Sequence, residues 1–173
     1  MSDTDNKPNF HFNDAIVEML KSKLKETGSL PPLLIMVKDD KIMAAILSPE
    51  LMENKDLLAL TIQGELSKYN PEIYYIVTDA FVHRVKETNI GKGVNDYLSN
   101  SVGTNGKLLV PDSEKFEVIN LLVTKVNPDS SKNRWMGLIE YSRDSEGKVI
   151  SFKPAEWHKD GEKGLSIKGR FVL

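Results

Sequence analysis

Two stretches of the chain carry apolar residues at helical spacing, and they predict two principal helices. Residues 14–27 form the first helix, with Asn13 as its N-cap and Gly28 in the left-handed position just beyond its end. The second helix covers residues 49–68, begins at a Ser-Pro-Glu start signal and contains Asn54 as a second cap, where the helix would restart. These local signals define both helices.

Strand spacing predicts a central strand over Pro71–Lys86, the longest segment rich in β-branched and aromatic residues. Asp39-Asp40 indicates a hairpin turn between two short strands that are apolar on both faces. A strand of that kind is expected to be covered above and below. The other strands are expected at 33–38, 42–47, 116–126, 135–143, 148–153 and, as a C-terminal edge strand, 166–173.

Short links and the absence of a regular strand–helix–strand alternation favour an α+β fold. We expect a mainly antiparallel sheet of about six strands, with the two principal helices packed on one face. The doubly apolar strands then need cover on the second face, from a folded-back segment or from another copy of the chain. A homodimer is therefore expected.

The polar residues divide the chain into a tail and one domain. Residues 1–9 are expected to be a disordered tail, and residues 10–173 a single α+β domain. Residues 87–112 are rich in Asn, Ser, Thr and Gly. Because structureless connections longer than about 12–15 residues are uncommon, we interpret this segment as a flexible insertion.

Composition narrows the function classes. The chain has 23 basic and 25 acidic residues, a formal net charge of −2, so general binding of nucleic acid loses support. Residues 125–173 nevertheless hold 10 basic and 7 acidic residues. Nucleic-acid binding therefore stays open as an alternative if the basic residues of this part gather on one face, namely Arg134, Arg143, Lys148, Lys153 and Arg170.

The expected cellular location of the protein follows from three features that the sequence lacks: cysteine, a signal peptide and a long apolar segment. There is no cysteine, which removes disulfides, thiolate metal sites and a cysteine nucleophile. The N-terminus is polar and acidic, unlike a signal peptide, and the longest apolar runs are far shorter than the roughly 20 residues of a membrane-spanning helix. We expect a soluble, cytoplasmic protein without a membrane partner.

Asp79 and His83 share one face of the predicted central strand. They lie four residues apart, roughly 13 Å, which is too far for a hydrogen bond between them. A polar site forms there only if Glu140 or Arg143 joins from a neighbouring strand; otherwise this is an ordinary exposed strand end.

Glycines and lysines alternate in the predicted insertion, at Gly91-Lys92-Gly93 and at residues 103–107. Backbone amides of such a loop bind phosphate, with Lys92 and Lys107 adding charge, although the spacing of a phosphate-binding P-loop is missing. The ligand-binding candidates are therefore Asp79, His83, Lys92 and Lys107, against the simpler interpretation of a disordered insertion.

No catalytic group emerges from the sequence. The three histidines fall in separate segments without metal-ligand spacing, and no serine stands in a nucleophile motif. We therefore expect no metal, no cofactor and no catalytic residue. The leading hypothesis is a non-catalytic binding or protein-interaction module. The alternatives are an enzyme with a site near Asp79, His83 and the 87–112 loop, and a nucleic-acid-binding protein.

Overall fold

A computed structural model describes residues 7–83 and 115–161 of the chain. The described elements follow one another along the chain in the order helix, hairpin, helix pair and five further strands. They are α1 (Asn13–Thr27), β1 (Leu33–Lys38), β2 (Lys41–Ile46), α2 (Pro49–Glu53), α3 (Lys55–Tyr69), β3 (Ile73–His83), β4 (Lys115–Val126), β5 (Lys132–Arg143), β6 (Val149–Phe152) and β7 (Glu156–Lys159).

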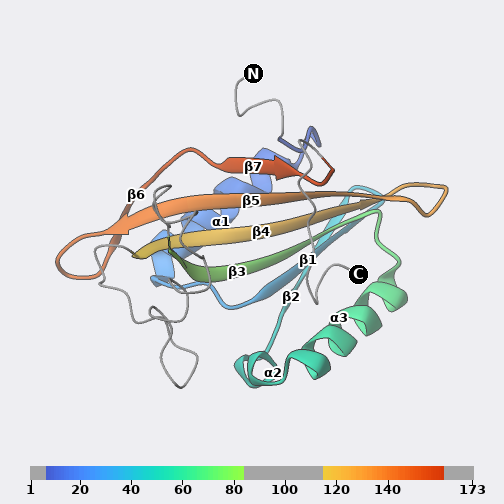
Figure 1. Ribbon diagram of the computed structural model, residues 1–173, viewed down its shortest axis with the longest axis horizontal. Coiled ribbons are helices and arrows are strands. Elements are labelled where there is room, and N and C mark those ends of the chain that lie inside the picture. The colour runs from blue at the N-terminus through green and yellow to red at the C-terminus, as the bar shows by residue number, and fades with distance from the viewer. Residues whose placement is uncertain (1–6, 84–114, 162–173) are drawn as a thin grey trace, which may run out of the picture.

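The strands form one antiparallel sheet with the order β2-β1-β3-β4-β5-β6, and β7 pairs with β5 beside β6 (Figure 1). The predicted α+β class with a mainly antiparallel sheet is confirmed. β7 is a correction, because no strand was expected between residues 153 and 166. A strand of four residues is too short for its alternation of apolar and polar residues to be recognised in the sequence. In the structure Trp157 is buried and Glu156 is exposed. The expected strand at 166–173 lies outside the described residues.

The start of α1 differs from the prediction, whereas its end agrees. Phe12 is the N-cap, and Asn13 lies inside the helix, fully buried, where its side-chain oxygen accepts a hydrogen bond from the Tyr75 hydroxyl at 2.5 Å. A partner 62 residues away thus takes the oxygen that a cap would use. Gly28 ends the helix with φ 83°, as predicted.

The second predicted helix is divided where the sequence placed a second cap. The Asn54 side chain accepts a hydrogen bond from the Leu57 N–H at 3.1 Å and so starts α3 after the short helix α2. α3 ends at Asn70, which takes the left-handed conformation with φ 48°. The predicted restart is confirmed.

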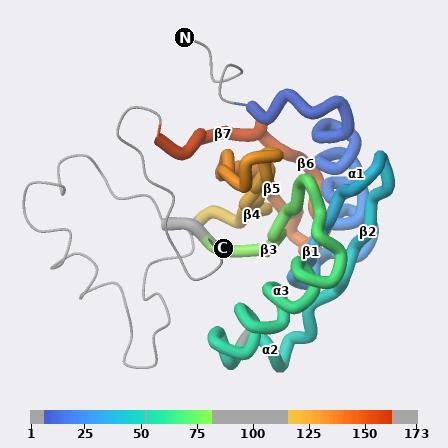
Figure 2. Tube along the Cα trace, turned by 90° about the vertical axis from the view of Figure 1, so that its right-hand side faces the viewer, coloured from blue at the N-terminus to red at the C-terminus, as the bar shows by residue number. Residues whose placement is uncertain are grey.

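The two principal helices pack on opposite faces of the sheet, which corrects the expectation of one face (Figure 2). On β1, Ile35 and Val37 belong to the core under α1, whereas Leu34 and Met36 belong to a second core under α3. Successive residues of a strand point to opposite faces, so β1 is covered on both sides by its own chain. Its doubly apolar pattern therefore needs no second copy.

β2 was expected to be covered on both faces, but the described residues do not cover it in this way. It forms one end of the sheet, and most of its residues are exposed, including Ile42 (48%), Met43 (40%) and Ile46 (71%). β2 has nearly the same apolar pattern as β1, but it lacks a neighbouring strand on its outer side within the described residues. This uncovered edge is the main departure from the sequence-based picture.

Candidate functional site

Asp79 lies on the α1 face of β3 and holds two other elements together. One carboxylate oxygen accepts a hydrogen bond from the Tyr141 hydroxyl of β5 at 2.5 Å, and the other lies 3.5 Å from the backbone N–H of Leu30, after α1. Burial raises the pKa of the Tyr141 hydroxyl above its ordinary value, and the hydrogen bond to Asp79 raises it further. The hydroxyl therefore holds its proton more firmly and donates it in the hydrogen bond to Asp79.

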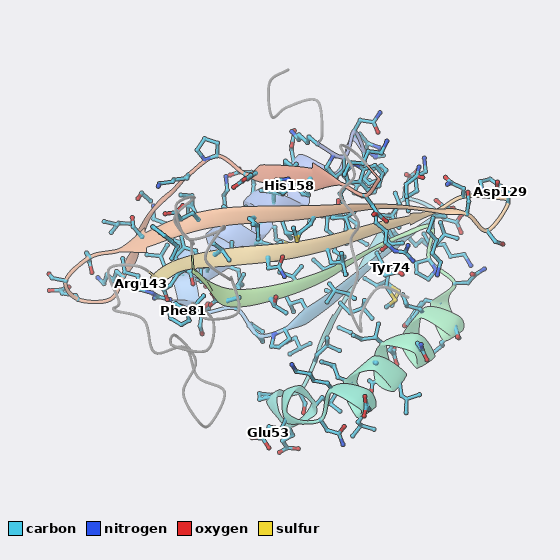
Figure 3. The ribbon with its side chains drawn as sticks, in the orientation of Figure 1. Glu53, Tyr74, Phe81, Asp129, Arg143 and His158 are labelled. Carbon is cyan, nitrogen blue, oxygen red and sulfur yellow. The ribbon has the colours of Figure 1, made fainter. Side chains whose placement is uncertain are left out.

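Arg143, one of the two candidates named from the sequence, extends this polar cluster on the same face. Its Nε donates to Glu117 at 2.7 Å, and its other nitrogens donate to the backbone carbonyls of Gly28 and Gly147 at 2.9 and 3.0 Å. The hydrogen bond to Glu117 raises the pKa of the guanidinium. Figure 3 shows Arg143 and Phe81 at the same end of the sheet.

Glu140, the other candidate, does not join the cluster. In β4 and β5, Glu117 and Tyr141 form a cross-strand pair, so Glu140 belongs to the opposite face, where it pairs with Lys153 at 3.1 Å. The described cluster is therefore a clamp that ties the end of α1 to the sheet, since each polar group in it binds another part of the chain.

The remaining predicted ligand-binding residues are not tested by the structure. Lys92, Lys107 and the loop 87–112 lie outside the described residues, and so does the side chain of His83. The hypothesis of a site around them stays a prediction.

Two of the basic residues in the C-terminal part, Arg134 and Arg143, lie on opposite faces of the sheet. Arg143 lies on the α1 face beside Glu117, whereas Arg134 stands opposite Thr124 on the other face. These two arginines are nine residues apart on β5, roughly 30 Å. Arg170 lies outside the described residues, and nucleic-acid binding stays a prediction.

A hollow of about 690 Å³ lies between the start of α1 and the link from β6 to β7. Its charged lining residues carry both signs, namely Lys7, Lys21, Lys153, Asp14, Glu18, Glu140 and Glu156. Several of them neutralise one another in ion pairs: Lys7 with Asp14, Lys21 with Glu18 and Lys153 with Glu140. The lining therefore selects no class of ligand.

The described part of the chain offers neither a cluster of metal ligands nor a membrane-spanning helix. Among residues 7–83 and 115–161, no group of three or more histidine, aspartate or glutamate side chains is placed to hold a metal ion. No helix in the described ranges is long and apolar enough to cross a membrane.

The outer edge of β2 is the candidate interface. The Leu47 N–H bonds to the Pro32 carbonyl at 2.8 Å, which fixes the alternation of hydrogen-bonded and non-bonded pairs between β1 and β2. Backbone groups turned away from β1 therefore belong to Ile42, Ala44 and Ile46. Their N–H and C=O groups point outward from the free edge, where the backbone of another strand can bind them.

The two edges of the sheet differ in how well they are protected against pairing with a strand of another chain. At one end, β6 and β7 have four residues each, and β7 carries Glu156, His158 and Lys159. Short strands and charges are the usual protection against pairing with another chain. At the other end, β2 has no charge from Ile42 to Ile46. Sequence reasoning missed this edge, because the signal, an apolar strand, is the same for buried and edge strands.

Comparison with protein-family models, with curated protein sequences and with solved structures found no match for this chain.

Proposed function

We propose that this chain is a non-catalytic protein-interaction module that binds a strand of another polypeptide along the free edge of β2. The observation that carries the proposal is the combination of outward backbone groups with the exposed apolar side chains of Ile42 and Ile46. In β-strand addition, main-chain hydrogen bonds supply affinity and alternate side chains supply specificity. β2 offers both.

The lack of protection on this edge among the described residues supports the proposal. Exposed apolar edge strands are hazards for aggregation unless they are blunted by charge, proline or a covering segment. The segment from Ile42 to Ile46 carries neither charge nor proline. A binding role explains why such an edge is retained. The cytoplasmic location expected from the sequence remains part of this proposal.

No specific observation in the described residues favours the two alternatives. Asp79, the described member of the predicted site, has its carboxylate engaged by Tyr141 and lies within a clamp. Arg134 and Arg143 lie on opposite faces. The protein-interaction module is therefore the function that the geometry supports best.

A displayed library of short peptides tests this proposal. The library is selected on the wild-type chain, and the enriched peptides are measured against I42K/I46K and against the control I150K. Ile150 is an exposed isoleucine on β6, at the other end of the sheet, so I150K adds the same kind of charge elsewhere.

We expect the enriched peptides to alternate apolar residues and to bind I42K/I46K at least about 10-fold more weakly than wild type. I150K is expected to bind them as wild type does. Peptides that bind all three chains equally, or a selection that enriches none, would contradict the proposed function.

A further inference from the structure

We propose that the strand bound by β2 is β2 of a second copy of this chain, paired antiparallel about a two-fold axis at Ala44. The inference rests on the proposed function and names its partner. The first argument is the backbone. Because Ala44 turns both its N–H and its C=O outward, it can form a hydrogen-bonded pair with the partner's Ala44.

The same axis places each remaining outward residue opposite another outward residue. Ile42 meets the partner's Ile46, and Ile46 meets the partner's Ile42. Each of the three pairs exchanges two main-chain hydrogen bonds, about six in all. The outward backbone groups of Ile42, Ala44 and Ile46 are then all satisfied by the second copy.

Side chains fit this register as well. The segment reads Ile-Met-Ala-Ala-Ile, with β-branched residues at both ends and a small residue at the centre. Pairs of β-branched residues directly opposite each other stabilise a sheet. Met43, 40% exposed on the α3 face, lies opposite the partner's Ala45. A large side chain thus meets a small one on that face.

Other registers are less complementary. Moving the axis to Met43 puts Ile46 opposite the partner's Asp40, and moving it to Ala45 puts Ile42 opposite the partner's Ser48. Only the axis at Ala44 sets all three outward apolar residues against one another. It also leaves the charge at Lys41 opposite the partner's Leu47, so no like charges face each other.

The overall charge does not oppose association of two copies. The formal net charge of −2 gives weak repulsion between identical chains. A strand pair of this length is a small interface, so we expect a reversible monomer–dimer equilibrium in place of an obligate dimer.

Sedimentation equilibrium over a range of concentrations up to millimolar tests the pairing on the full chain. Wild type is expected to approach twice the 19.5 kDa of one chain as concentration rises. I42K/I46K places like charges opposite each other in both outer pairs, and its dissociation constant is expected to rise at least about 10-fold. I150K is the matched control and is expected to dimerise like wild type.

A charge-swapped variant tests the register. I42E/I46K changes the same two positions, but about the Ala44 axis it sets opposite charges against each other. We expect it to dimerise better than I42K/I46K, with a preference that weakens as salt is added. Circular dichroism checks that each variant is folded. If a double variant is not folded, Ile46→Lys alone serves, because that side chain is 71% exposed.

Three results would overturn the inference: a wild-type chain that is monomeric at every concentration, a dimer that I42K/I46K leaves intact, or an I42E/I46K chain that dissociates like I42K/I46K. The peptide selection separates these failures from failure of the proposed function. A monomeric chain whose selected peptides are lost in I42K/I46K is still an interaction module, but its partner is a different polypeptide.

Discussion

A glycine in β5 allows a tryptophan of the neighbouring strand to pack against the β5 backbone. Gly137 of β5 pairs with Trp157 of β7, and a Cβ added at Gly137 would come within 2.6 Å of the indole ring. The missing side chain is what allows the buried Trp157 to lie across β5. Gly64, in contrast, lies in α3 with open space where its Cβ would be.

We predict that Gly137→Ala lowers the free energy of unfolding by about 1–3 kcal/mol, because the indole ring must move from a packed position. Gly64→Ala is the control, and it is expected to raise the free energy of unfolding by up to about 1 kcal/mol, since alanine favours a helix interior. Urea denaturation measures both. Equal effects of the two substitutions would refute the close contact at Gly137.

Ionisation of Tyr141 makes the stability of the fold depend on pH. Its folded-state pKa lies above the ordinary value of 10.0, mainly because of burial and secondly because of Asp79. The unfolded chain therefore loses this proton first as pH rises. The contribution of Tyr141 to stability is complete below about pH 10 and decreases as pH rises toward the folded pKa.

We predict that Tyr141→Phe is less stable than wild type by about 1 kcal/mol near neutral pH, because the hydrogen bond to Asp79 is lost. Above about pH 10 its stability should fall less steeply than that of wild type, because it lacks the linked ionisation. Tyr74 and Tyr75, whose pKa values are also raised by burial, are present in both chains and cancel in the comparison. Denaturation at several pH values measures the slopes, and parallel slopes would disprove the linkage.

At the scale of elements, features set by neighbouring residues could be predicted from the sequence. The end of α1 at Gly28 and the restart at Asn54 depend only on local backbone geometry and capping, and both predictions are confirmed. The role of Asn13 could not be predicted in this way, because its partner Tyr75 is distant in sequence. β7 was missed for a related reason, since Trp157 is fixed by its fit over Gly137.

The cap at Asn54 is directly testable. Asn54→Ala should lower the free energy of unfolding by about 1 kcal/mol, because the Leu57 N–H loses its side-chain acceptor. Ser48→Ala is the control, since Ser48 is the N-cap of α2 but makes no side-chain capping hydrogen bond. Chemical denaturation distinguishes the two. A cost at Ser48 equal to that at Asn54 would show that the hydrogen bond from the Leu57 N–H does not carry the effect.

At the scale of the whole molecule, the sequence predicts the class of the fold but not which strand lies at its edge. β1 and β2 have similar apolar patterns, and only the pairing of β1 with β3 leaves β2 outside. The same limit applies to the candidate site. The sequence left open whether Glu140 or Arg143 would join Asp79 in a polar cluster. Arg143 does join it, and the described contacts of both residues are to other parts of the chain.

The measurement that tests the central claim most directly is amide hydrogen exchange of β2 as a function of protein concentration. In dilute solution we predict an alternation, with slow exchange at Met43 and Ala45, which bond to β1, and fast exchange at Ile42, Ala44 and Ile46. At high concentration the three fast amides should become protected together. Protection of all five at low concentration, or continued fast exchange of the three at high concentration, would contradict a free edge that binds a second copy.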